Sequence, residues 1–148
     1  MRNICNDATK RDAKWMNFLY YHSLDLGFNC NSRIVAAMVV KNELIAIGDN
    51  SGKSHPFQDK FKKRDGCIYL HAEVNTIHKS LKRIYSHNTI PNTGSSILKK
   101  ATLYVCRTKR DNSWGLAKPC SGCQRAILEF GVGRVVYSTG NFEEWVEL

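Results

Sequence analysis

Two short motifs limit what this chain can fold into more than any other feature of it. The first is His71-Ala72-Glu73, and the second, well downstream, is Pro119-Cys120-Ser121-Gly122-Cys123. One imidazole and two thiolates are ligands that zinc prefers in proteins. The fold must therefore bring two distant segments together around one metal ion, with a carboxylate beside it.

Each motif is predicted to open a helix. Cys120 and Cys123 are three residues apart, so they share one face of the first turn, with Pro119 at the first helical position, where proline is best tolerated. His71 and Glu73 point about 200° apart on a straight helix, so they can share a site only beyond the helix start. Two helix N-termini then converge on the metal, and both helix dipoles favour the cysteines as thiolates.

The number of ligands indicates a catalytic zinc site. Tetrahedral zinc bound by His71, Cys120 and Cys123 keeps its fourth position for water, whose pKa can fall to about 7. Glu73 is the natural proton carrier, because it can accept the water proton without binding the metal. The alternatives are a structural zinc site and a zinc-stabilised binding module without catalysis, and neither requires the carboxylate of Glu73.

The pattern of apolar residues predicts an α/β fold. Helical spacing and β-branched runs alternate along the chain, and a polar loop fills residues 48–69, directly ahead of His71. Strand-helix-strand crossovers join parallel strands, so we expect a three-layer α/β/α sandwich with a mixed sheet. The predicted helices are 7–26, 70–85 and 119–130; the predicted strands are 34–40, 44–47, 101–106 and 134–137; and residues 142–148 form a short helix or an edge strand.

Length and composition place the chain among ordinary globular proteins. Its 148 residues fit a single domain, residues 1–148, and no apolar run approaches the roughly 20 residues that span a bilayer. The polar N-terminus lacks the apolar core of a signal peptide, so we expect a cytoplasmic protein whose six cysteines are reduced. The spare cysteines Cys5, Cys30, Cys67 and Cys106 leave room for a second, structural zinc, although a free cysteine is commonly just a small buried hydrophobic residue.

The net charge of +9 predicts an anionic partner but not its size. Basic stretches occur at Lys53, at residues 60–64 and at residues 107–110. In a mononucleotide enzyme one or two of these side chains would bind a phosphate. In an enzyme that acts on single-stranded DNA or RNA, several would follow the backbone, and Trp114 or Tyr69 would stack on a flanking base.

The two motifs, H-x-E and P-C-x-x-C, are the signature of zinc-dependent base deaminases. The sequence resembles the cytidine and deoxycytidylate deaminase superfamily from about Arg33 to Ser138, and Asn75 after His-Ala-Glu is most similar to the deoxycytidylate deaminases. Gly48-Asp49-Asn50 is similar to the family's Gly-x-Asn. The loop from Arg107 to Lys118 is longer than is usual in deoxycytidylate deaminases, and the chain ends soon after the last predicted strand.

The resemblance implies a hydrolase acting on a cyclic amidine, here the conversion of dCMP to dUMP with release of ammonia. It implies that Glu73 relays protons, that Asn50 holds the substrate sugar or its own backbone, and that the amides of Ala72 and Cys120 contact the base. Asn75 is either a substrate contact or a brace for its helix. The resemblance also implies a homo-oligomer in nucleotide metabolism. A cytosine or adenine base deaminase acting on single-stranded DNA or RNA remains the alternative.

Overall fold

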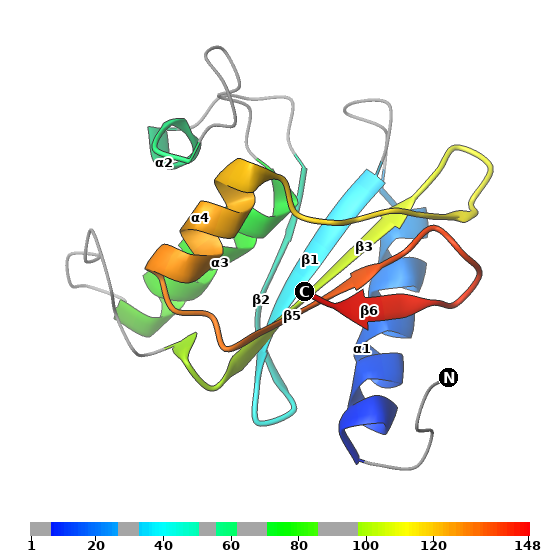
Figure 1. The fold of residues 1–148 in the computed structure, drawn as a ribbon, viewed down its shortest axis with the longest axis horizontal. Coiled ribbons are helices and arrows are strands. Elements are labelled where there is room, and N and C mark those ends of the chain that lie inside the picture. Colours follow the sequence, from blue (N-terminus) through cyan, green and yellow to red (C-terminus); the bar gives the residue numbers. More distant parts are fainter. Residues whose placement is uncertain (1–6, 27–32, 51–55, 62–70, 86–97) are drawn as a thin grey trace.

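The computed structural model describes residues 7–26, 33–50, 56–61, 71–85 and 98–148. Within these ranges one β-sheet is covered by helices on both faces (Figure 1). The elements in chain order are α1 (Asp7–Leu24), β1 (Arg33–Val40), β2 (Glu43–Asp49), α2 (Pro56–Asp59), α3 (Ala72–Tyr85), β3 (Ala101–Thr108), β4 (Trp114–Gly115), α4 (Ser121–Glu129), β5 (Arg134–Ser138) and β6 (Trp145–Glu147).

The sheet is mixed, with strand order β2-β1-β3-β5-β6 and the short β4 paired to the end of β3. β1 runs antiparallel to both β2 and β3, whereas β3 and β5 are parallel and are joined through α4. β6 returns antiparallel to β5. The parallel pair follows from the β3-α4-β5 crossover, because the helical connection carries the chain back to the end of the sheet at which β3 began.

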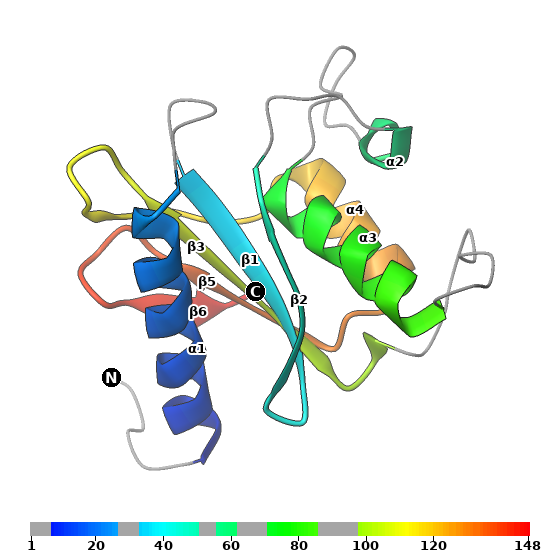
Figure 2. The same ribbon diagram turned by 180° about the vertical axis from the view of Figure 1, so that it is seen from behind.

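Two apolar cores lie on opposite faces of the sheet. One lies under α3 and α4, where alternate β1 and β3 residues such as Met38 and Leu103 pack against Ile77 and Phe130. The other lies under α1, where Met16 and Leu19 pack against the opposite side of the same strands. The two ribbon views show α1 alone on its face, with α3 and α4 side by side on the other (Figures 1 and 2). The predicted three-layer α/β/α sandwich is therefore confirmed.

The turn between β1 and β2 is fixed against α1. Lys41 and Asn42 both have positive φ, of 51° and 60°, as a tight two-residue hairpin turn requires. The side-chain oxygen of Asn42 accepts hydrogen bonds from the indole Nε1 of Trp15, at 3.0 Å, and from the ammonium of Lys14, at 3.4 Å. The hairpin tip therefore has one orientation relative to α1.

The outer edge of β2 is covered by long basic side chains from α3. Arg83 donates hydrogen bonds to the carbonyl oxygens of Leu44 and Ile45, at 3.0 and 2.8 Å, and Lys79 donates to that of Ile47, at 3.3 Å. Ile45 lies where the β1–β2 register shifts, so it has no partner in the ladder. Three carbonyls of this edge strand are thus satisfied by side chains.

Most of the predicted elements are present with small changes at their ends. The first helix ends at Leu24 instead of Leu26, and the chain's tail is the edge strand β6, one of its two predicted forms. The loop predicted for residues 48–69 contains the last two residues of β2 and the one-turn helix α2, and the polar loop before Pro119 contains β4. The connector at 86–96 and the loop residues 51–55 and 62–69 lie outside the described residues.

In the part of the chain that the structure describes, no helix combines the length and the apolar character needed to cross a bilayer.

Candidate metal centre

The two motifs meet at the N-termini of α3 and α4. The carbonyl of His71 accepts the first intrahelical hydrogen bond of α3, from the amide of Asn75 at 2.9 Å, and the carbonyl of Cys120 accepts the equivalent bond of α4 from Gln124. Cys120 is the N-cap residue, with extended backbone, and its side chain makes no capping bond. The prediction that Pro119 occupies the first helical position was wrong, because Pro119 precedes the cap. Both helices nevertheless direct their positive ends at one point.

The three predicted ligands have the spacing that zinc requires. The Nδ1 atom of His71 lies 3.6 Å from the Sγ of Cys120 and 3.3 Å from the Sγ of Cys123. The three donor atoms all lie within 4.8 Å of one another. Tetrahedral zinc with Zn–S of about 2.3 Å and Zn–N of about 2.0 Å places N and S donors about 3.5 Å apart. The donor set and its geometry therefore fit zinc with one position open.

The two ligand cysteines have pKa values shifted in opposite directions. The pKa of Cys120 is lowered to about 3, chiefly because the thiol of Cys123 donates a hydrogen bond to its thiolate, with a further contribution from His71. The pKa of Cys123 is raised for the same reason, since it holds the shared proton, and burial adds to the effect. The lowered pKa of Cys120 favours its thiolate, whereas zinc binding through Cys123 has to displace the shared proton.

Glu73 is buried beside the ligands. Its side chain belongs to the first turn of α3 and the residue is only 5% exposed. Burial raises the pKa of the carboxyl, whereas its backbone hydrogen bond and the charge of His71 act in the opposite direction. A hydrogen-bonding contact with Cys123 places the carboxyl next to the ligand sulfur. The site therefore holds a buried carboxyl group with a raised pKa, in addition to the metal ligands.

Gln58 of α2 is a site residue that the sequence did not reveal. Its Oε1 accepts a hydrogen bond from the backbone N–H of His71 at 3.0 Å, and its side chain is fully buried. Because the backbone N–H of His71 can only donate, the oxygen end of the Gln58 side-chain amide must face His71. The other end, Nε2, has no hydrogen-bond partner in the described part of the chain. No motif or spacing marks this glutamine, which lies in a stretch predicted to be a polar loop.

The start of α3 is held on the sheet by close contacts. The hydroxyl of Thr76 shares its proton between the carbonyl of Ala72 in its own helix, at 2.7 Å, and the carbonyl of Ala36 in β1, at 3.1 Å. A Cβ atom on Gly48 of β2 would lie 2.7 Å from the hydroxyl of Thr76 and 3.0 Å from its amide nitrogen. A side chain at position 48 would therefore push α3 away from the strand, and glycine allows the approach.

The two asparagines predicted to contact substrate have structural bonds. Asn50 continues the β1–β2 pairing, because its amide donates to the carbonyl of Ile34 and its Oδ1 accepts from the amide of Ile34. The buried Asn75 donates from Nδ2 to the carbonyl of Asp49 at 3.1 Å. Asn75 thus braces α3 against the end of β2, which is one of its two predicted roles.

Several other predicted features lie away from the metal ligands or outside the described residues. Trp114 is 3% exposed and stacks on Tyr20 with 4.6 Å between ring centroids, so its predicted role as a base-stacking platform is wrong. The loop after β3 is held by α1 and β1, since Tyr20 and Arg33 donate to Asn112. Cys106 is buried. The other spare cysteines, Cys5, Cys30 and Cys67, lie outside the described residues, as do Lys53, Tyr69 and residues 62–64.

The described fold and site together define an α/β protein with a three-ligand metal centre and a buried carboxyl group beside it. The chain belongs to the family of cytidine and deoxycytidylate deaminases, because the model of that family's zinc-binding region matches residues 9–139. The family match and the fit of His71, Cys120 and Cys123 confirm zinc as the cofactor.

One solved structure similar to the chain is that of a dCMP deaminase from the cyanophage S-TIM5, in its apo form. The two are 20% identical, over 93% of this chain and 84% of that chain, with a TM-score of 0.47. No curated protein matches the chain. The family match and the site geometry therefore support the deaminase assignment without identifying the substrate.

Proposed function

We propose that this chain catalyses the hydrolytic deamination of a cytosine nucleotide, with dCMP converted to dUMP and ammonia. The observation that carries the proposal is the buried carboxyl group of Glu73 beside a three-ligand zinc site. A site that served structure alone would have no use for a carboxyl group whose burial is unfavourable to its charge. The Asn75 that follows His-Ala-Glu favours dCMP among the cytosine nucleotides.

The proposed roles of the protein groups follow from their positions. His71, Cys120 and Cys123 hold the zinc, which when bound supplies a Lewis acid that lowers the pKa of water in its open position. Glu73 takes one proton from that water and delivers it to the ring nitrogen next to the reacting carbon. It then carries the second proton of the same water to the amino group, so that the carbon–nitrogen bond breaks, ammonia leaves and the oxygen stays on the ring as a carbonyl.

Backbone amides at the two helix starts are proposed to orient the base. Ala72 is the first residue of α3, and Cys120 is the N-cap residue of α4, and the first amides of a helix have no intrahelical acceptor. Such amides suit the carbonyl oxygen of a pyrimidine ring. Asn50 is proposed to contact the sugar, and Asn75 to keep α3 at the distance from β2 that this contact requires.

Comparing Glu73→Ala with the parent tests the proposal. We expect the variant to bind one equivalent of zinc per chain and to lose deamination by a factor of about 10²–10⁴, the usual contribution of a positioned acid-base group. Zinc is measured by elemental mass spectrometry, and deamination by the ultraviolet change from cytosine to uracil. The exposed Glu43→Ala serves as the matched control. Equal activity of Glu73→Ala and the parent would instead favour a zinc-stabilised binding module.

A substrate panel tests the identity of the nucleotide. Zinc-loaded protein should release ammonia from dCMP faster than from CMP, dCTP or the nucleosides. The net charge of +9 favours one other candidate, a deaminase acting on single-stranded DNA or RNA. An oligonucleotide belongs in the panel for this reason, because a polymer substrate would show activity that falls steeply with salt, and a mononucleotide would not. Light scattering of the same sample tests the proposed homo-oligomer.

A further inference from the structure

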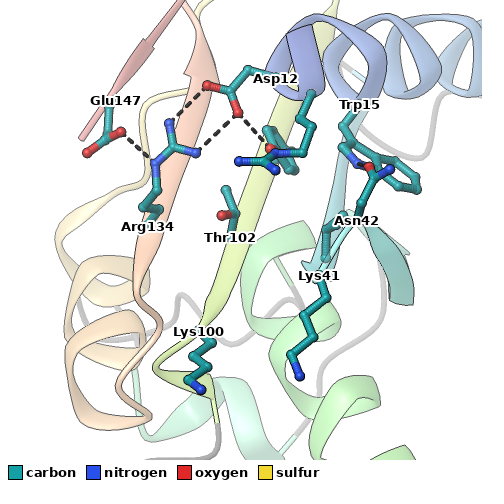
Figure 3. Close-up of a pocket in the computed structure, with 11 residues that line it drawn as sticks. Asp12, Trp15, Lys41, Asn42, Lys100, Thr102, Arg134 and Glu147 are labelled. Carbon is teal, nitrogen blue, oxygen red and sulfur yellow. Dashed lines mark hydrogen bonds and ion pairs between the residues drawn. The ribbon is translucent and has the colours of Figure 1, made fainter. Parts of the chain in front are cut away.

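A hollow on the α1 face of the sheet lies apart from the metal centre. Its cavity volume is about 570 Å³, within the range of small-molecule sites. It is formed where α1, the β1–β2 turn and the starts of β3 and β5 come together (Figure 3). His71, Cys120 and Cys123 lie at the starts of α3 and α4 on the opposite face, so this hollow is no extension of the zinc site.

The acidic side chains of this pocket are already paired. Asp12 is 8% exposed and accepts hydrogen bonds from the two terminal nitrogens of Arg134, at 3.2 and 2.9 Å, and from the hydroxyl of Tyr104, at 2.6 Å. Glu147 accepts from the Nε of Arg134 at 2.7 Å. Burial, followed by the hydrogen bond to Asp12, raises the pKa of Tyr104, so its hydroxyl stays neutral. The bonds to Asp12 and Glu147 raise the pKa of Arg134, so its guanidinium stays charged. One cation is thus shared by two carboxylates.

The remaining basic side chains of the pocket have no such partner. Among the described residues that line it, four are basic and two are acidic, an excess of two positive charges. Neither Lys41 nor Lys100 makes an ion pair within the described residues, and Arg11 lies close enough to Tyr104 to affect its pKa. Figure 3 shows the Asp12–Arg134–Glu147 network at one end of the hollow and the two lysines at the other, with Thr102 between them.

The part of the wall that carries Lys41 is fixed in place. The turn that carries Lys41 is fixed by the bond between Asn42 and Trp15, and Trp15 itself forms part of the wall. Proteins commonly bind phosphate groups with lysine and arginine side chains placed around a concave surface. A polynucleotide would instead need an extended groove with exposed aromatic rings.

We propose that this pocket binds a small molecule carrying two or more phosphate groups. The cations Arg11, Lys41 and Lys100 neutralise the phosphates, the hydroxyl of Thr102 donates a hydrogen bond, and the Asp12–Arg134 pair forms the rigid end of the site. The pocket is separate from the deaminase centre, so this binding does not depend on catalysis.

Titration of the zinc-loaded protein with inorganic tripolyphosphate, followed by ¹⁵N-¹H NMR, tests the proposal. The chain has three tryptophans, so three indole N–H signals report on three places, and only Trp15 lines this pocket. We expect the Trp15 signal, assigned with Trp15→Phe, to move saturably while those of Trp114 and Trp145 stay. ATP should produce the same shift, and adenosine, which lacks phosphate, should produce none.

Substitutions separate this pocket from general surface charge. The double variant Lys41→Gln/Lys100→Gln should bind tripolyphosphate at least tenfold more weakly. The control Lys82→Gln/Lys99→Gln removes the same charge from exposed lysines outside the pocket, one of them adjacent to Lys100, and should bind as the parent does. Equal weakening in both variants, an unmoved Trp15 signal, or binding of a single-stranded oligonucleotide without binding of tripolyphosphate would each overturn the proposal.

Discussion

At the scale of single residues, the metal centre depends on side chains that do not touch the metal. Gln58 accepts the backbone N–H of His71 and so fixes where the ligand's backbone lies. Thr76 and Asn75 tie the first turn of α3 to β1 and β2. The positions of the metal donors and of the Glu73 carboxyl group therefore follow from bonds made by their neighbours.

Replacing Gln58 should loosen the metal site. Gln58→Met has similar volume and no acceptor, so we expect zinc to bind about 10–100-fold more weakly, the usual cost of losing a group that orients a ligand. Gln58→Glu keeps an acceptor for the His71 amide and should recover part of the affinity. Competition with a chelator of known zinc affinity measures both. A fall in the thermal stability of the zinc-free variant with unchanged zinc affinity would mean that Gln58 serves only folding.

The cysteines should differ sharply in their reactivity with pH. Burial raises the pKa of the Cys106 thiol to about 12, so the native protein should leave it unalkylated up to pH 10. In urea the same thiol should react near pH 9, its ordinary pKa. The folded state therefore binds this proton more tightly than the unfolded state does. The Cys106 thiol adds to the free energy of unfolding below pH 9, and this contribution is lost as the pH rises from 9 toward about 12.

Cys120 gives the opposite expectation in the same experiment. Its lowered pKa keeps it ionised at pH 6, so iodoacetamide should modify it in zinc-free protein, and zinc should protect it. Peptide mass spectrometry after timed alkylation distinguishes the individual cysteines. Modification of Cys106 at pH 8 in the native state would contradict its burial, and failure to modify Cys120 at pH 6 in zinc-free protein would contradict its lowered pKa.

At the scale of elements, periodicity in the sequence predicted the helices and strands that pack by an apolar face. α1, α3, α4 and the four longer strands each bury such a face, so their pattern survives in the sequence. α2 and β4 have four and two residues, too few to show a period. α2 is tied to the start of α3 through Gln58 and His71, and β4 pairs with the end of β3 while Trp114 packs on Tyr20. Such contacts leave no repeating pattern in the sequence.

The junction between α1 and the sheet should be sensitive to Asp12. Asp12→Asn removes the more buried of the two charged partners of Arg134 and weakens the bond to Tyr104. We expect a loss of about 2 kcal/mol, less than the 3–5 kcal/mol typical of a fully buried pair, because the Arg134 side chain is 34% exposed. Glu147→Gln, which removes the more exposed partner of Arg134, should cost less than about 1 kcal/mol. Urea unfolding of zinc-loaded variants measures both, and equal losses would contradict this ranking.

At the scale of the whole molecule, the zinc site joins segments that the sequence separates widely. His71 and Cys120 are 49 positions apart, and β3 lies between them. The sequence could predict that the two motifs meet, because zinc chemistry requires it. It could not predict which loops surround them, since the loops gain their shape from packing and not from a repeating pattern.

Unfolding should therefore be one transition that depends on zinc. The 148 residues are predicted to form a single domain, so fluorescence and circular dichroism should report the same midpoint. Free zinc at 100 times its dissociation constant should add about 2.7 kcal/mol of stability, and a chelator should remove it. Two separate transitions in the zinc-loaded protein would contradict the single domain.

The basic side chains of α3 along β2 have a consequence for how copies of this chain can meet. An uncovered edge strand can pair with a strand of another molecule, and such pairing is a common route to aggregation. Here Arg83 and Lys79 already occupy carbonyls of β2 and surround that edge with positive charge. We therefore expect β2 to resist joining another sheet, so that crowded or partly unfolded molecules are kept from growing into fibrils along this edge.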